Sequence, residues 1–319
     1  MTVEGWRVKT STMTAPLPDA APSNWVDRHA PAVLQPWLRL GRFDRPTGIW
    51  LLMLPGSQGI ALACAAQRQP PSPTLLLLFF LGAALMRAAG CAYNDIVDRD
   101  IDAKVARTAG RPIPAGQITV TQAWVFIALC CALSLAVLLS FNRLAIGLGA
   151  ASLLLVAAYP FMKRITWWPQ AWLGLTFNWG ALLGYAAVTG RVDLPALLLY
   201  ASGVFWTLGY DTIYAVQDLE DDALAGVKSS ARRLGAAAPK AVLGFYIAAF
   251  ALALGAAFTA GLGPLFLPPA AIFGMMLSRQ AQKLDIADPV GALALFKSNT
   301  WAGLLLFCAL AAGLWMPAG

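Results

Sequence analysis

Long apolar stretches recur along the chain and are separated by short polar connections. Each stretch is near the roughly 20 residues that a helix needs to cross a bilayer. The backbone in lipid is satisfied only within helices or closed barrels, and these stretches are too long and too uniformly apolar for barrel strands. They predict an all-α membrane protein, a bundle of nine transmembrane helices. The expected spans are residues 46–66, 73–93, 119–140, 143–161, 168–188, 194–214, 239–260, 263–280 and 292–316.

Composition supports this prediction. Of the 319 residues, 59% are hydrophobic and 12% are charged, whereas roughly 25% are charged in a soluble domain. The net charge of +7 comes from basic residues spread between the apolar stretches, and a nucleic-acid surface would gather them in a stripe. The five cysteines have neither metal nor disulfide spacing and are interpreted as packing residues. Gly147, Gly149, Gly180 and Gly184 lie in apolar segments and indicate close helix packing.

The first residues differ from the rest of the chain. Residues 1–35 are polar and rich in proline, with no apolar run. A cleaved secretory signal needs an apolar core of about 7–15 residues, so we interpret 1–35 as a mobile cytoplasmic tail and 36–319 as one nine-helix transmembrane domain. A mitochondrial transit peptide is disfavoured by Glu4, Asp19 and Asp27, since such peptides are poor in acidic residues.

Basic residues also set the orientation. With nine spans and a cytoplasmic N-terminus, nineteen of the 23 Lys and Arg residues fall at the cytoplasmic side and three at the opposite side. This asymmetry agrees with the positive-inside rule and puts the C-terminus on the opposite side. We therefore expect a multi-pass protein of a bacterial inner (plasma) membrane, with the mitochondrial inner membrane as the less favoured alternative.

The acidic residues gather in two short segments. Nine of the sixteen lie between Asp95 and Asp102 or between Asp211 and Asp222. Each segment leaves the cytoplasmic end of an even-numbered span, so we expect both on the same side of the membrane. At 100° per residue, Asn94, Asp95, Asp98 and Asp102 share one helix face and Asp100 does not. Asp211, Asp218 and Asp222 share a face of the second helix, and Glu220 points elsewhere.

Carboxylates on one helix face repel one another, so a cation is expected to neutralise them. Mg²⁺ prefers oxygen ligands, usually one or two carboxylates, water and substrate phosphate. Two such segments around one cavity predict two Mg²⁺ ions bridged by a diphosphate. The alternative is a pair of solvated acidic helix ends, which the shared face and shared side disfavour.

Cations that suit a diphosphate stand near the acidic segments. Arg pairs bidentately with phosphate oxygens and Lys acts as a point charge, although each residue alone also fits the positive-inside pattern. The candidates are Arg107, Arg111, Lys163, Arg164 and Lys228. Arg87 lies two helical turns before Asn94, inside a span. An intramembrane cation suggests a functional site, here one that holds a substrate carboxylate or a phosphate oxygen, and snorkelling to the interface is the alternative.

Four motifs in order resemble those of the UbiA family of intramembrane prenyltransferases. They are RFDRPTG at 42–48, the segment NDIVDRDIDAKVARTAGRP from Asn94, YPFMKRITWWPQ at 159–170 and YDTIYAVQDLEDD from Tyr210. They run from about residue 38 to 235, and beyond that only FKSN at 296–299 resembles the family. Among its branches the chain is most similar to the one whose acceptor is 4-hydroxybenzoate.

The resemblance implies a nine-helix bundle with a central cavity that opens laterally to lipid. It implies Mg²⁺ as cofactor, with Asn94, Asp98, Asp102, Asp218 and Asp222 as the metal set and Asp95 and Asp211 in support. It implies that Arg42, Arg107, Arg111, Lys163 and Lys228 surround the diphosphate of a polyprenyl diphosphate. Arg87 would face the carboxylate of the aromatic acceptor.

The reaction so implied joins the allylic C1 to the ring carbon ortho to the hydroxyl of 4-hydroxybenzoate, a step in ubiquinone biosynthesis. Asp211 or Asp222 would orient the hydroxyl or take the proton, and apolar walls would keep water from the allylic cation. Haem, a naphthoate, homogentisate or chlorophyllide are alternative acceptors. A cation-coupled secondary transporter is a further alternative, disfavoured because its ionisable residues would lie near the membrane midplane.

Overall fold

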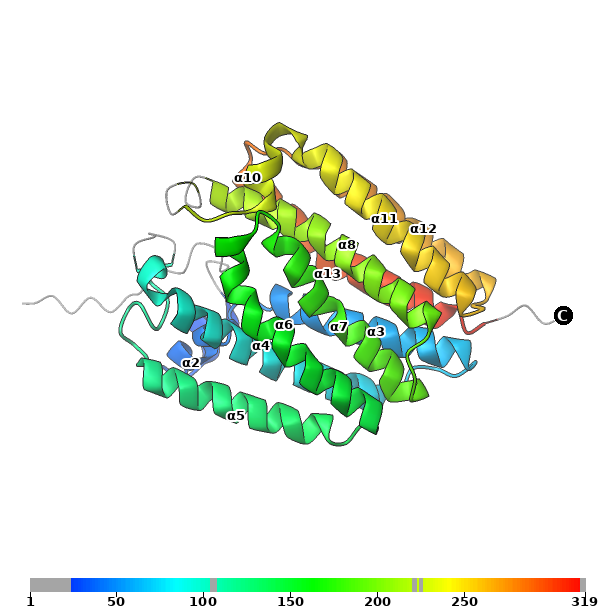
Figure 1. Ribbon diagram of the computed structural model, residues 1–319, viewed down its shortest axis with the longest axis horizontal. Coiled ribbons are helices and arrows are strands. Elements are labelled where there is room, and N and C mark those ends of the chain that lie inside the picture. The colour runs from blue at the N-terminus through cyan, green and yellow to red at the C-terminus, as the bar shows by residue number, and fades with distance from the viewer. Residues whose placement is uncertain (1–23, 104–107, 220–222, 224–225, 316–319) are drawn as a thin grey trace, which may run out of the picture.

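The computed structural model describes residues 24–103, 108–219, 223 and 226–315, and this part of the chain contains helices and no strands. The long helices form one bundle with their axes roughly aligned (Figure 1). They are α3 (Thr47–Ala66), α4 (Pro73–Asp102), α5 (Val120–Leu138), α6 (Arg143–Ile165), α7 (Pro169–Thr189), α8 (Leu194–Ala215), α11 (Ala238–Thr259), α12 (Leu267–Lys283) and α13 (Pro289–Ala312). Short elements are α1 (Trp25–His29), α2 (Gln35–Leu40), α10 (Ser230–Leu234) and the 3₁₀ turns η1 (Val216–Asp218), η2 (Gly235–Ala237) and η3 (Pro264–Phe266).

Each of the nine predicted ranges overlaps one of the long helices, and α4 continues nine residues beyond the predicted end at residue 93. Among the described residues, six helical segments are long and apolar enough to cross a membrane: α3, α4, α5, α6, α13 and the segment Ser230–Thr259 that includes α11. The chain is therefore an all-helical integral membrane protein, and nine crossings stay a prediction.

Buried polar groups and short length distinguish the remaining long helices, α7, α8 and α12. On α7 the Asn178 amide is fully buried and donates to Thr207 Oγ1 of α8 at 2.7 Å. Such pairs lower the hydropathy of both helices while the neighbouring helix shields them from lipid. α12 has 17 residues, fewer than the roughly 20 that span hydrocarbon without thinning the bilayer.

Side-chain caps set where several helices begin. Ser72 accepts a bond from the backbone N–H of Leu75 at the start of α4, and Asn142 does the same for Ala145 at the start of α6. Thr119 and Gln122 form a capping box at the start of α5. Each cap satisfies a backbone donor that the first helical turn leaves open, which places the helix starts at polar residues between the apolar runs.

Helix α3 lies in the centre, packed against α4, α7, α8 and α13. Glycines allow the backbones of α3 and α7 to approach closely at their interface. A Cβ on Gly59 would lie 2.2 Å from the Ala181 carbonyl oxygen, and one on Gly184 would lie 2.2 Å from that of Gly56. The close packing predicted for Gly180 and Gly184 is therefore confirmed, whereas Gly147 has open space around its Cα.

The bundle is less tightly packed on the side of α5 and α6. α5 packs mainly on α4, and α6 mainly on α7, with few contacts between the two pairs. The space between the pairs forms part of the cavity described below. The C-terminal ends of α4 and α8 lie at the same end of the bundle, toward the left in Figure 1, as the sequence predicted for the two acidic segments.

The described part of the predicted tail, residues 24–35, contacts the side of the bundle where α4 and α8 end. Trp25 on α1 donates its indole N–H to the Phe43 carbonyl at 2.7 Å, and Arg39 pairs with Asp27 at 2.8 Å. Residues 1–23 lie outside the described residues, so a mobile tail there, and the boundary at residue 35, stay predictions.

Candidate active site

A cavity of about 620 Å³ lies between α3, α4, α5, α6 and α7 and reaches α8 and α13. Its lining changes from one end to the other. The end near the acidic segments is lined by Arg42, Arg45, Arg87, Asn94, Asp95, Arg111, Asp211 and Lys297. The far end is apolar and lined by Leu78, Phe79, Leu138, Phe141, Ile146 and Leu183. Along α4 the lining runs from Leu78 to Asp95, about 26 Å at 1.5 Å per residue.

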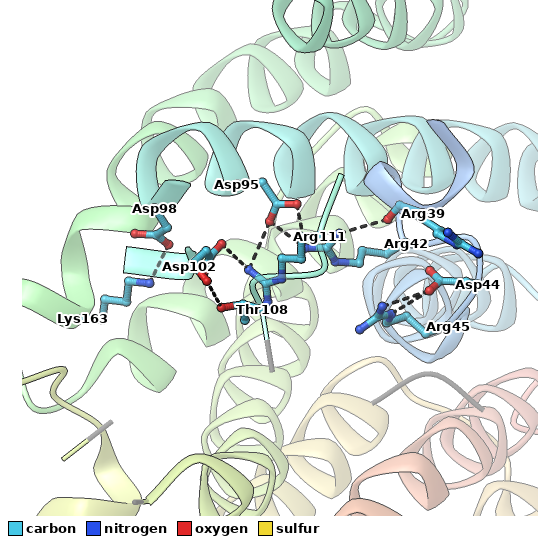
Figure 2. A network of polar contacts seen from close by, with 10 residues as sticks. All are labelled: Arg39, Arg42, Asp44, Arg45, Asp95, Asp98, Asp102, Thr108, Arg111 and Lys163. Atoms are coloured by element: carbon cyan, nitrogen blue, oxygen red, sulfur yellow. Dashed lines mark hydrogen bonds and ion pairs between the residues drawn. The ribbon is translucent and has the colours of Figure 1, made fainter. Parts of the chain in front are cut away.

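The acidic face of α4 is as predicted. Asp95 and Asp98 have no exposed surface, Asp102 is buried, and Asn94 lines the cavity. The side chain of Asp100, in contrast, is 84% exposed. α4 continues without interruption to Asp102, so the helical period brings the three carboxylates to one side (Figure 2).

Arg42 and Arg111 neutralise Asp95. Nη2 of Arg42 donates to both carboxylate oxygens, at 2.6 and 2.9 Å, and Nη1 of Arg111 donates to Oδ1 at 3.3 Å. Burial, the largest single influence, would lower the pKa of Arg42, but Asp95, with smaller contributions from Cys91 and Asp44, raises the pKa above its ordinary value. Arg42 also has a φ of +61°, a conformation that costs a non-glycine residue roughly 1 kcal/mol or more. The ion pair holds it there.

Arg111 joins the first turn of the acidic segment to its end. The same Nη1 donates to Asp102 Oδ2 at 2.6 Å, two helical turns beyond Asp95. Thr108 donates its hydroxyl to the backbone carbonyl of Asp102 at 2.8 Å. Residues 108–111 thereby fold back on the C-terminal end of α4, and Arg111 brings its guanidinium to two carboxylates (Figure 2).

Two cations from the last turn of α6 bind Asp98. Lys163 Nζ lies 2.5 Å from Oδ2, and Arg164 Nη2 lies 3.1 Å from Oδ1. The Arg164 side chain is 45% exposed and that of Lys163 is 26% exposed. Both charged groups would therefore remain solvated if they moved away from Asp98. Neither residue lines the cavity.

The second acidic segment departs from the predicted geometry. α8 ends at Ala215 and the 3₁₀ turn η1 follows, ending at Asp218. A 3₁₀ turn advances about 120° per residue, so the 100° spacing assumed for Asp211 and Asp218 does not hold across this boundary. Asp211 lines the cavity and Asp218 is partly buried. Asp222 lies outside the described residues.

Arg87 and Asp211 both line the cavity, and Arg87 is a positive group that acts electrostatically on Asp211. Its guanidinium stands over the ring of Phe177, 5.4 Å from the centroid. A Cβ on Gly48 of α3 would lie 2.8 Å from Nε and from Nη2, so the guanidinium packs against bare backbone. Within the described residues, the buried Nε has no hydrogen-bond partner, which leaves a donor for a ligand.

The other cations predicted around a diphosphate differ in position. Arg42 and Arg111 line the cavity. Lys228 does not line it. Its Nζ donates to the backbone carbonyl of Ile165 at 3.1 Å, and its backbone N–H donates to the backbone carbonyl of Lys163 at 3.0 Å. Lys228 thus ties the segment after η1 to the end of α6. Arg107 lies outside the described residues.

Sequence reasoning missed two basic residues that line the cavity, Arg45 and Lys297. Both had been counted only toward the positive-inside asymmetry. Their positions within RFDRPTG and FKSN were the available signal. Arg45 pairs with Asp44 at 2.9 Å, while Lys297 comes from α13, far along the chain.

The donor chemistry of the charged end suits a hard divalent ion. Its acidic and amide groups are all oxygen ligands, and Mg²⁺ prefers these. No three of the Asp, Glu, His and Cys side chains in the described ranges converge closely enough to hold a metal by themselves. That agrees with an ion that takes one or two carboxylates and completes its shell with water and substrate phosphate.

Comparisons with known proteins agree with this geometry. Residues 52–310 match the UbiA prenyltransferase family. The mitochondrial 4-hydroxybenzoate polyprenyltransferase of Bos taurus is 50% identical over 286 residues, covering 89% of this chain and 76% of that protein. The human protein of the same name is 49% identical over 289 residues, covering 90% and 77%, and the Arabidopsis thaliana one is 44% identical over 292 residues, covering 91% and 72%.

Solved structures show the same fold. The apo structure of a UbiA homologue from Aeropyrum pernix has a TM-score of 0.69 at 26% identity, covering 82% of this chain and 96% of that one. A UbiA homologue from Archaeoglobus fulgidus bound to GPP and Mg²⁺ has a TM-score of 0.62 at 19% identity, covering 87% and 98%. The chain belongs to the UbiA family of prenyltransferases.

Proposed function

We propose that this protein transfers a polyprenyl group from polyprenyl diphosphate to 4-hydroxybenzoate with the help of Mg²⁺, in ubiquinone biosynthesis. The observation that carries the proposal is the single cavity that joins a charged end to a long apolar end. Relatives with 44–50% identity over about nine-tenths of the chain are named for this activity. The proposed domain is the nine-helix bundle, with all nine long helices crossing the membrane.

The apolar end of the cavity suits a polyprenyl tail. The whole cavity lining on α4, from apolar Leu78 to Asp95 at the charged end, extends about 26 Å, close to the roughly 30 Å of hydrocarbon in a bilayer. Because α5 and α6 make few contacts with each other, the tail can lie between the two helix pairs at the level of the membrane core. Apolar walls would also keep water from an allylic cation at the reacting C1.

The charged end would take the diphosphate and its metal ions. Asn94, Asp95, Asp98 and Asp102 on α4, with Asp218 and Asp222 beyond α8, are the proposed oxygen ligands. Bound Mg²⁺ would neutralise the negative charge that builds up on the departing diphosphate. Lys163 and Arg164 form ion pairs with Asp98. If Asp98 bound a metal ion, these two cations would be available to bind phosphate oxygens.

Basic side chains would complete the diphosphate site. Arg42 and Arg111 already line the cavity beside Asp95, and guanidinium groups match phosphate oxygens. Arg107 and Lys228 are proposed to support the site from the connections beside it. Such groups lower the barrier when they meet charge that develops in the transition state.

The acceptor would lie between the two ends, beside Arg87. The Arg87 guanidinium, with its buried unpaired Nε over Phe177, would bind the carboxylate of 4-hydroxybenzoate. In the reaction the C1–oxygen bond to diphosphate breaks and a C1–carbon bond forms ortho to the phenol hydroxyl. The proton of that ring carbon then leaves, with Asp211 or Asp222 as its acceptor or as the group that orients the hydroxyl.

The names of the relatives indicate which cellular membrane this chain occupies. Sequence analysis favoured a bacterial plasma membrane, whereas the relatives of 44–50% identity are named mitochondrial proteins. We therefore favour a mitochondrial membrane for this chain over a bacterial one. Fractionation of cells that express the tagged chain would test this.

The test of function is transfer in detergent with purified protein, 4-hydroxybenzoate, Mg²⁺ and polyprenyl diphosphates of several chain lengths. Prenylated 4-hydroxybenzoate should form and EDTA should abolish it. Asp98→Asn should lose activity, while the matched control Asp100→Asn, at an 84% exposed side chain of the same segment, should keep it. No product with 4-hydroxybenzoate, but product with a naphthoate or homogentisate, would refute the acceptor and leave the transferase class intact.

A further inference from the structure

Basic residues that line the cavity are unevenly distributed along the chain. Five do so among the described residues, and four of them lie between residues 42 and 111: Arg42, Arg45, Arg87 and Arg111. The wall formed by α8 and α13 contributes one, Lys297. That wall stands beside η1, the turn that ends at Asp218.

The first four cations already act on carboxylates. Arg42 and Arg111 form ion pairs with Asp95, and Arg45 forms one with Asp44 at 2.9 Å. Arg87 acts electrostatically on Asp211. Lys297 differs from them, since within the described parts of the chain it makes no ion pair or side-chain hydrogen bond. It is an exposed ammonium on α13, and the polar residues that follow it, Ser298 and Asn299, hydrogen-bond to neighbouring helices. A basic residue that lines a cavity within a membrane bundle suggests a functional site.

Neighbouring side chains fix the rotation of α13 and therefore the direction of Lys297. Phe296 packs against Tyr214 of α8, with ring centroids 4.6 Å apart and the ring planes tilted by 52°. Asn299 accepts a bond from the Trp206 indole at 2.9 Å, and Ser298 accepts one from Gln280 of α12 at 2.8 Å. These contacts direct one side of α13 to α8 and another to α12.

With those two sides occupied, Lys297 faces the cavity together with Leu293, four residues earlier on the same helix face. The contact of Phe296 with Tyr214 sets Lys297 at the level of the end of α8. Asp211 and η1 lie at this level, near the charged end of the cavity, whereas Arg87 lies two turns deeper than Asn94 along α4.

We propose that Lys297 binds the diphosphate of the prenyl donor from the α13 side, opposite the cations held by α4 and its loop. The proposal rests on the proposed function and adds a ligand-binding residue from the last helix. A lysine ammonium binds phosphate as a point charge and does not need the planar, bidentate geometry of an arginine. It would supply positive charge from α13, the helix that contacts η1, the turn ending at Asp218.

The test compares Lys297→Gln and Lys297→Arg with the parent protein in neutral detergent without added anionic lipid. Lys297→Gln should raise KM for the prenyl diphosphate roughly 10-fold to 100-fold, as expected for loss of a charge-assisted bond. KM for 4-hydroxybenzoate should be unchanged, and Lys297→Arg should retain most of the affinity. Lys283→Gln, which removes an exposed lysine from the end of α12 outside the cavity, is the matched control and should behave as the parent.

A binding measurement separates this proposal from the identity of the acceptor. Inorganic diphosphate with Mg²⁺ should raise the melting temperature of the parent protein without any acceptor present, and Lys297→Gln should weaken that shift. An equal shift in both proteins would overturn the proposal while transfer activity in the parent would still support the function. A rise in KM for 4-hydroxybenzoate alone would also overturn it, because Lys297 would then serve the acceptor.

Discussion

The Arg42–Asp95 pair allows a prediction that separates stability from catalysis. Asp95 has no exposed surface and Arg42 is 7% exposed, and Nη2 of Arg42 contacts both carboxylate oxygens at 2.6 and 2.9 Å. Asp95→Ala leaves the guanidinium buried without its main counterion. Arg111, in contrast, keeps Asp102 at 2.6 Å.

The expected cost follows from the burial of both partners. Removing one member of a buried pair costs about 3–5 kcal/mol, because the remaining charge stays desolvated and unpaired. Replacing both members by apolar residues is often neutral or stabilising. We therefore expect Asp95→Ala to lose about 3–5 kcal/mol and the double variant Arg42→Met, Asp95→Leu to recover most of that loss.

The assay is reversible unfolding in mixed micelles of detergent and SDS, followed by tryptophan fluorescence, with prenyl transfer measured in parallel. Because both residues also line the charged end of the cavity, the double variant should regain stability and remain inactive. A loss below about 0.5 kcal/mol in Asp95→Ala, or full activity in the double variant, would refute this reasoning.

Three further outcomes are expected. Removal of Mg²⁺ by EDTA should abolish transfer and added Mg²⁺ should restore it; activity that survives exhaustive chelation would contradict a metal role. Asp98→Asn should lower kcat about 10²-fold to 10³-fold, the size seen when one electrostatic stabiliser is removed, and an unchanged kcat would rule Asp98 out as a ligand. Arg87→Met should raise KM for 4-hydroxybenzoate roughly 10-fold to 100-fold, with no such effect on the prenyl diphosphate, and the reverse pattern would move Arg87 to the diphosphate.

The first acidic segment could be predicted because it lies within one uninterrupted helix. With α4 continuing to Asp102, the period of 3.6 residues alone separates buried Asp95 and Asp98 from exposed Asp100. The second segment has no such continuity. α8 gives way to a 3₁₀ turn after Ala215, and no glycine or proline between Asp211 and Asp218 marks that change in the sequence.

Contacts between distant residues were not predictable from periodicity. Lys163 and Asp98 are 65 positions apart and meet because α6 ends beside α4. Lys297 shows a second limit. A basic residue near the cytoplasmic end of a span has the same sequence pattern whether it faces lipid headgroups or a cavity. Which way it faces depends on helix rotation, here fixed by side chains such as Phe296 and Asn299.

Gly48 carries a consequence for interpreting natural variation in this chain. It has no functional group, yet the Arg87 guanidinium rests against its backbone at distances that a methyl group would occupy. An alanine variant at position 48 would therefore displace the guanidinium and resemble a defect in acceptor recognition, although every charged residue is intact. A survey of variants that scores only the Asp, Arg and Lys positions would miss such a change.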